Sequence, residues 1–159
     1  MATVERNSHA HPHSTAKIGG HPIHPMLVSF PIVLFIGTLV ADIVFVSTSD
    51  PMWAIGSRYL LGIGIIMAAL AAVAGLTDFM SSERIRHMSD ALKHMLANVT
   101  AVVLEIINFF VRLHSDSAIR GVGIVLSVIV VLILLYSGWK GGSLVFEHGI
   151  GVEDDGRAL

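Results

Sequence analysis

Four long apolar runs are the feature that most constrains what this chain can fold into. They span residues 26–46, 59–76, 95–111 and 122–139. Each is close to the roughly 20 residues that an α-helix needs to cross a bilayer. The first, second and fourth runs have almost no polar face, which a helix of a soluble bundle requires. The sequence therefore predicts an all-α integral membrane protein, a four-helix bundle with both termini on the same side.

The composition agrees with a membrane protein and narrows its chemistry. Only 14% of the residues are charged and 53% are hydrophobic, and the mean hydropathy is +0.74. The chain has no cysteine, so any metal it binds must use histidine, carboxylate, methionine or backbone oxygen. The net charge of −2 and the lack of a basic groove with interleaved aromatic residues argue against a nucleic-acid partner.

The polar ends of the chain suggest a simple domain organisation. Residues 1–18 are expected to form a flexible N-terminal tail, residues 19–152 the four-span membrane domain, and residues 153–159 a C-terminal tail. The first seventeen residues lack the hydrophobic core of a secretory signal, so the first span is interpreted as an uncleaved anchor. The bilayer is the one partner that the composition requires, and a homo-oligomer is left open.

The distribution of basic residues predicts the orientation. An even number of spans places the N-terminal tail, the connector 77–94 and the C-terminal tail on one face, here called side A. Side A then carries seven basic residues: Arg6, Lys17, Arg84, Arg86, Lys93, Lys140 and Arg157. The opposite face, side B, carries three: Arg58, Arg112 and Arg120. The positive-inside rule makes side A cytoplasmic.

Small residues predict two local features of the second and fourth runs. Gly64, Ala68 and Ala72 recur every fourth residue, a spacing that lets membrane helices pack closely. The same face could also make room for a flat cofactor. In the fourth run, the glycines between Gly138 and Gly142 are expected to break the helix and return the chain toward the mouth of the bundle.

Histidines gather at side A although they are scattered in the sequence. In the stretch from Gly19 to Pro25, His21 and His24 each precede a proline, which disfavours helical geometry at both. Pro25 suits the first turn of the following helix. Side A also receives Asp78, His94 and His148. Because the first and third helices both start there, we expect His24 and His94 to converge at similar depth.

A polar stripe marks the third run. It comprises His87, His94, Asn98, Glu105, Asn108 and Arg112, at spacings that place them on one helical face. Glu105 falls near the middle of the span, where an ionisable side chain is expected to face the bundle interior. Its role is either a proton or ion pathway or an interhelical hydrogen bond, and Asn108 is interpreted as a packing residue.

The chain resembles a family of bacterial membrane proteins known as domain of unknown function 2231. The resemblance rests on Gly20-His21-Pro22-Ile23-His24-Pro25, Phe30-Pro31, Asp42, Gly75-Leu76-Thr77-Asp78-Phe79, His94-Met95-Leu96-Ala97-Asn98, Gly138-Trp139-Lys140-Gly141-Gly142-Ser143-Leu144-Val145-Phe146 and His148-Gly149-Ile150-Gly151-Val152. It implies four spans in a bacterial inner membrane and no settled activity. It marks His21, His24, Asp78, His94, Asn98, Trp139 and His148, but not Glu105. Relatives joined to Rieske-type domains associate the family with redox work.

Four functions compete for this pattern. The first is a redox subunit that binds haem b through His21, His24, His94 or His148 and passes electrons to a partner protein. The second is a divalent metal site built from His24, His94 and Asp78. The third is a proton or ion pathway through the intramembrane residues Glu105, Asn98 and Asn108. The fourth is a structural or assembly protein without a cofactor. An enzyme is disfavoured, because the sequence has no nucleophile–base pair at recognisable spacing and no phosphate loop.

Overall fold

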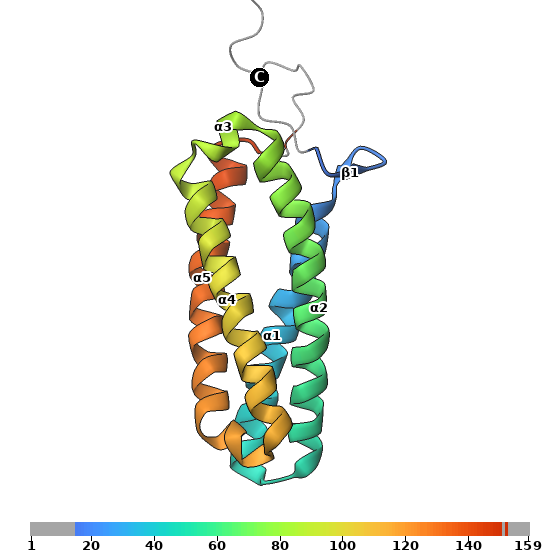
Figure 1. The fold of residues 1–159 in the computed structure, drawn as a ribbon, viewed down its shortest axis with the longest axis vertical. Helices are drawn as coiled ribbons and strands as arrows, with labels where there is room; N and C mark the ends of the chain where they lie inside the picture. Colours follow the sequence, from blue (N-terminus) through green and yellow to red (C-terminus); the bar gives the residue numbers. More distant parts are fainter. Residues whose placement is uncertain (1–14, 151, 153–159) are drawn as a thin grey trace, which may run out of the picture.

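A computed structural model describes residues 15–150 and 152, and four long helices dominate this part of the chain. They are α1 (Ile23–Thr48), α2 (Pro51–Ser81), α4 (Ser89–His114) and α5 (Val122–Phe146). Each is long and apolar enough to cross a membrane. The helices run along the longest axis of the molecule (Figure 1). The predicted all-α bundle of four membrane helices is confirmed.

Short elements close the two ends of the bundle. The strands β1 (Lys17–Ile18) and β2 (His21–Pro22) pair through a turn in which Gly19 and Gly20 have φ angles of +57° and +86°. Such angles suit glycine in a tight hairpin. This hairpin and α3 (Glu83–Arg86) lie at side A, whereas the turn after α1 and the 3₁₀ helix η1 (Asp116–Arg120) lie at side B (Figure 1).

The first and last described residues lie at the same end of the bundle. The chain enters α1 from β2 and leaves α5 near α3, so both segments are at side A (Figure 1). The predicted boundary at residue 19 falls in the turn between β1 and β2. The termini themselves, and with them His9, His11 and His13, lie outside the described residues.

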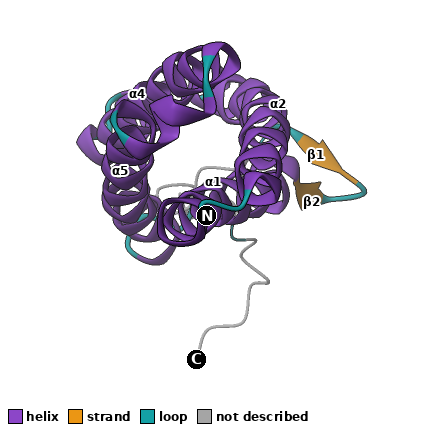
Figure 2. Cartoon of the chain, turned by 90° about the horizontal axis from the view of Figure 1, so that it is seen from below, coloured by secondary structure: helices purple, strands orange, loops and turns teal. Residues whose placement is uncertain are grey.

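The helices form a ring in which each long helix has two long neighbours. Helix α1 packs beside α2 and α5, and α4 packs beside α5 and α2, so that the view along the bundle is a closed ring (Figure 2). Helices α1 and α4 therefore face each other across the bundle. This arrangement matters because the polar side chains described below come mainly from α1 and α4.

Small residues and a few large ones form the core. Phe35, Leu61, Ala68, Ala101 and Val130 are buried together near mid-span. Gly64 and Ala68 lie in this interface, as predicted, but Ala71 takes the place predicted for Ala72, which is exposed. Many large apolar side chains point outward, as expected for helices surrounded by lipid. In lipid the helices gain no hydrophobic free energy by associating, so close van der Waals packing must stabilise the bundle instead.

The two helical hairpins repeat one pattern of burial. Four buried residues of α1 each have a buried counterpart in α4, at the separation of 70 positions that relates Asp42 to Arg112. The pairs are Pro31 and Ala101, Phe35 and Glu105, Thr38 and Asn108, and Asp42 and Arg112. In α2 and α5 a second constant spacing relates Ser57 to Gly123, Leu61 to Ser127, Gly64 to Val130 and Ala71 to Ser137. The hairpin α1–α2 thus corresponds position by position to the hairpin α4–α5.

The predicted break in the fourth helix is wrong. Helix α5 continues through Gly138, Gly141 and Gly142 and ends at Phe146. Glycine lowers intrinsic helix propensity, but tertiary contacts decide here, because Gly141 packs directly against the ring of His94. The chain therefore turns back after Phe146 rather than after Trp139.

We predict that Gly64→Ala destabilises the bundle. A Cβ at Gly64 would lie 2.7 Å from the Cε1 atom of Phe35 and 3.3 Å from the Cβ of Leu34, and overpacking of this kind costs about 1–3 kcal/mol. Gly56→Ala, in the same helix, is the matched control, because a Cβ there meets nothing within 4 Å. Unfolding in mixed detergent micelles measures both variants. Equal stability of the two would contradict the packing described here.

Candidate functional site

Two histidines meet across the bundle near side A. His24 lies in the first turn of α1 and His94 near the start of α4. Their ring centroids are 6.2 Å apart and their planes are 89° apart. The prediction that these residues converge is confirmed. They are the only two histidines for which a ring-to-ring contact is found in the described part of the chain.

Both rings are held in the same way by the neighbouring helix. The Nδ1 atom of His24 is 2.8 Å from the carbonyl oxygen of Ala71 on α2. The Nδ1 atom of His94 is 2.8 Å from the carbonyl oxygen of Ser137 on α5. Since a carbonyl oxygen only accepts, Nδ1 carries the hydrogen in each ring and Nε2 keeps its lone pair. Metal-binding histidines in proteins are commonly oriented by this kind of hydrogen bond.

A glycine makes room for each ring. A Cβ at Gly75 would lie 2.8 Å from the Cε1 and Nδ1 atoms of His24, and a Cβ at Gly141 would lie 3.0 Å from the Cε1 atom of His94. Each glycine follows its carbonyl residue by one helical turn. The two histidine positions are thus built by the same arrangement in both hairpins. Neither glycine was predicted to contact a histidine.

Asn98 touches the free nitrogen of His94. Its Nδ2 atom lies 3.1 Å from the Nε2 atom of His94 and also donates to the backbone carbonyl of His94, at 2.9 Å. A ligand bound at Nε2 would displace only the first of these contacts. The amide of Asn98 would keep its hydrogen bond to the backbone carbonyl of His94, so it would still have a partner after a ligand took its place at Nε2.

The other predicted site residues lie elsewhere. The exposed ring of His21 has its Nδ1 atom 3.0 Å from the carbonyl oxygen of Gly19. The Oδ1 atom of Asp78 accepts the backbone N–H groups of Thr15 and Ala16, both at 2.8 Å. Asp78 therefore ties the segment before β1 to α2. The rings of His24 and His94 use backbone carbonyls instead of this carboxylate.

His148 belongs to a separate cluster with Asp90 and Glu147. Their ligand atoms lie within 4.8 Å of one another, and no other set of three histidine, cysteine, aspartate or glutamate side chains is this close among the described residues. The predicted set of His24, His94 and Asp78 is therefore not brought together. In the cluster itself, the ammonium group of Lys140 lies 3.0 Å from Asp90 and that of Lys93 lies 3.9 Å away. Lysine thus already supplies positive charge to Asp90.

A buried ion pair crosses the bundle closer to side B. Arg112 of α4 donates from both terminal nitrogens to Asp42 of α1, at 2.6 and 2.7 Å. Both side chains are fully buried. Arg112, predicted to be a basic residue of side B, instead lies inside the bundle. Side B then keeps two of its three basic residues, Arg58 and Arg120, which strengthens the charge bias toward side A.

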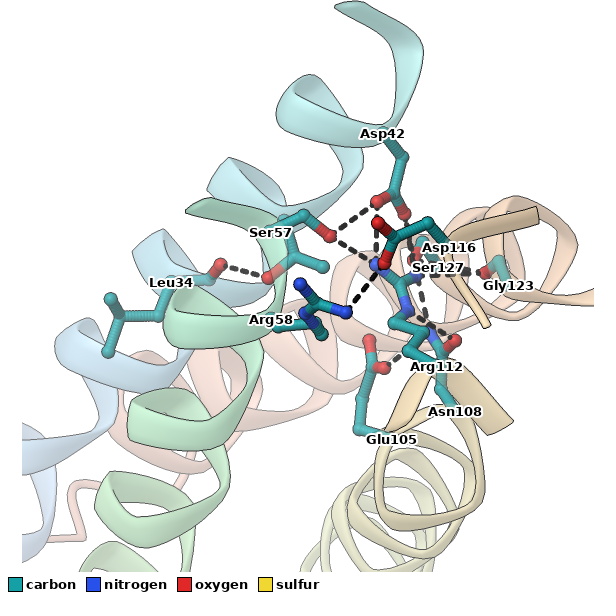
Figure 3. Close-up of polar contacts among 11 residues, drawn as sticks. Leu34, Asp42, Ser57, Arg58, Glu105, Asn108, Arg112, Asp116, Gly123 and Ser127 are labelled. Atoms are coloured by element: carbon teal, nitrogen blue, oxygen red, sulfur yellow. Dashed lines mark hydrogen bonds and ion pairs between the residues drawn. The ribbon is translucent and has the colours of Figure 1, made fainter. Parts of the chain in front are cut away.

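Hydroxyl groups from the remaining two helices complete the network around this pair (Figure 3). Ser57 of α2 donates to Asp42 at 2.7 Å and accepts from Arg112. Ser127 of α5 donates to Asp42 at 2.8 Å and accepts from Arg112 at 2.8 Å. All four long helices therefore contribute to a single polar cluster.

Glu105 and Asn108 extend the cluster toward the middle of the membrane. Arg112 donates from Nε to the Oδ1 atom of Asn108 at 2.8 Å, and Asn108 donates to the Oε2 atom of Glu105 at 2.9 Å. Glu105 has no exposed surface, so the prediction that it faces protein rather than lipid is confirmed. Asp42 and Ser57 were not predicted as site residues. Two opposite charges within separate spans were the signal that could have found the pair.

The fold and these two centres define a helical membrane protein of four spans with paired histidines near one end and a buried ion pair near the other. The family described as "predicted membrane protein (DUF2231)" matches residues 20–154, and the chain belongs to this family. The predicted resemblance is confirmed. No curated protein and no solved structure matches the chain.

We predict that breaking the buried pair is much costlier than breaking an exposed one. Arg112→Gln leaves the carboxylate of Asp42 without its cation, and a buried pair that loses one partner costs about 3–5 kcal/mol. The double variant with Asp42→Asn removes both charges and should recover part of this loss. Unfolding in mixed micelles provides the measurement.

The control for this prediction is the pair of Arg58 and Asp116. Their side chains are 29% and 41% exposed and their charged atoms are 2.5 Å apart. Exposed pairs contribute about 0–1 kcal/mol, so Arg58→Gln should change stability little. Similar losses for Arg58→Gln and Arg112→Gln would show that the buried network does not hold the bundle together.

Proposed function

We propose that this protein is a membrane-embedded electron-transfer subunit that binds a b-type haem between His24 and His94. The observation that carries the proposal is the pair of imidazoles 6.2 Å apart on helices that face each other across the bundle. Histidines on facing helices are the usual haem ligands in helical bundles.

The distance between the rings suits two ligands of one metal ion. A metal–imidazole bond would be about 2 Å long, so two rings whose centroids are 6.2 Å apart are close enough for His24 and His94 to hold one ion together. Because Nδ1 of both rings donates to a carbonyl, Nε2 is the nitrogen available to the ion.

The flanking helices present small residues at the level of the two rings. These residues are Ala71 and Gly75 of α2 and Ser137 and Gly141 of α5, and the space beside both glycines is taken by the rings of His24 and His94 themselves. Basic residues at the same end, including Lys17, Arg84 and Arg86, fit the negative charge of haem propionates.

Bound haem would supply one-electron chemistry, and the chain would supply the setting for it. His24 and His94 would hold the iron, and the carbonyls of Ala71 and Ser137 would orient both rings. The site lies near the end of the spans rather than at their centre. A redox partner protein at side A would therefore approach the cofactor without entering the bilayer.

We predict that the full-length protein purified in detergent shows sharp haem absorption bands on reduction. His24→Ala and His94→Ala should each abolish these bands while the protein still elutes as a folded species. His114→Ala is the control, because this exposed histidine lies at the end of α4 at side B, with Nδ1 near the carbonyl of Phe110. Metal analysis of the same sample distinguishes a bound divalent metal. Protein produced with sufficient haem that carries neither haem nor metal would refute the proposal.

We further propose that side A faces the cytoplasm of a bacterial inner membrane. With Arg112 assigned to the bundle interior, the remaining basic residues of the connectors and tails lie mostly at side A. A reporter fused after Leu159 should be active in the cytoplasm, and one inserted near Asp50 should be active outside it. The reverse pattern would overturn this orientation.

A further inference from the structure

One oxygen atom of the buried network has no hydrogen-bond partner. Among the described residues, Oε1 of Glu105 is the single buried side-chain nitrogen or oxygen in this condition. The other carboxyl oxygen, Oε2, accepts from Asn108 at 2.9 Å. Leaving a buried polar atom unpartnered is costly. The two oxygens of this carboxyl group are therefore in unequal environments, and the inequality needs a chemical explanation.

The nearby guanidinium group does not neutralise Glu105. Arg112 has five N–H bonds, and its recorded acceptors account for all of them. These acceptors are Asn108, both carboxylate oxygens of Asp42, the hydroxyls of Ser57 and Ser127, and the carbonyl of Gly123. None of these bonds goes to Glu105. The positive charge of Arg112 is thus paired with Asp42.

The one further cation drawn beside this network, Arg58 of α2, is paired with Asp116 at 2.5 Å (Figure 3). The charged group that faces the network from α1 is Asp42, and α4 itself contributes Arg112. Helices α2 and α5 contribute the neutral hydroxyls of Ser57 and Ser127. An ionised Glu105 would therefore leave one net negative charge inside the bundle. The residue lies nine positions before the end of α4 at His114, or about 13 Å from that end, where an unpaired charge is strongly disfavoured.

We propose that Glu105 is a proton-binding site within the membrane, with the proton on Oε1. In this form Oε2 is the carbonyl oxygen, which accepts the Asn108 hydrogen bond, and Oε1 is the hydroxyl oxygen. The carboxylate takes one proton from water and becomes a neutral acid, and no other bond changes. A divalent metal cation fits less well, because no group of three histidine, cysteine, aspartate or glutamate side chains in the described chain includes Glu105.

Infrared spectroscopy of the full-length protein in sodium-free lipid vesicles tests this site. The wild-type protein should show the carbonyl stretching band of a protonated carboxylic acid at neutral pH, shifted in deuterated water. Glu105→Gln should remove this band, because glutamine keeps the shape and loses the acid. Glu147→Gln should leave it unchanged, since that carboxylate is exposed at side A. Asn108→Leu should raise the band frequency, because Oε2 then loses its donor.

Two results would overturn the proposal. One is an acid band that stays unchanged in folded Glu105→Gln protein, or that is absent from the wild type. The other is loss of the band from the wild type when sodium is added at constant pH, which would make the site one for a cation. If Asn108→Leu does not fold, because Arg112 loses an acceptor, the comparison between Glu105→Gln and Glu147→Gln still decides.

Discussion

The interaction on which the rest of this structure depends is the ion pair between Asp42 and Arg112. Helices in lipid gain no hydrophobic free energy by associating, so packing and polar contacts must select the arrangement. The pair joins two helices that face each other across the ring, and Ser57 and Ser127 connect it to the other two. One cluster thereby sets the depth and rotation of all four spans, because a charge without its partner inside hydrocarbon is too costly to tolerate.

The features that sequence reasoning predicted correctly depend on local patterns or simple topology. Hydropathy located the four spans. The shared starting side of the first and third helices brought His24 and His94 together, and spacing along one helix placed Glu105 inside. The features that were not predicted depend on how each helix is rotated about its own axis relative to its neighbours. Arg112 lies two residues before the end of α4 and therefore resembles an interfacial cation in the sequence. Its role becomes clear only from its contact with Asp42 on the facing helix.

The glycines of the fourth helix also show that a local sequence property cannot predict contacts between helices. Gly138, Gly141 and Gly142 suggested a broken helix because propensity is a local property, yet α5 is continuous and Gly141 makes space for His94. Once α5 is longer, His148 is carried to the cluster of Asp90 and Glu147 instead of the histidine pair. Asp78 accepts hydrogen bonds from the backbone of Thr15 and Ala16, before β1, and such a contact between distant segments cannot be read from spacing along the chain.

The repeated burial pattern of the two hairpins has a consequence for self-association. If two identical hairpins packed around a two-fold axis, a residue close to that axis would lie against its own copy. A pair of histidines satisfies that condition, but a pair of Asp42 and Arg112 does not. Two copies of the first hairpin would oppose carboxylate to carboxylate, and two copies of the second would oppose guanidinium to guanidinium. Like charges would thus disfavour both of these dimers, whereas the ion pair of Asp42 and Arg112 favours packing of the first hairpin on the second.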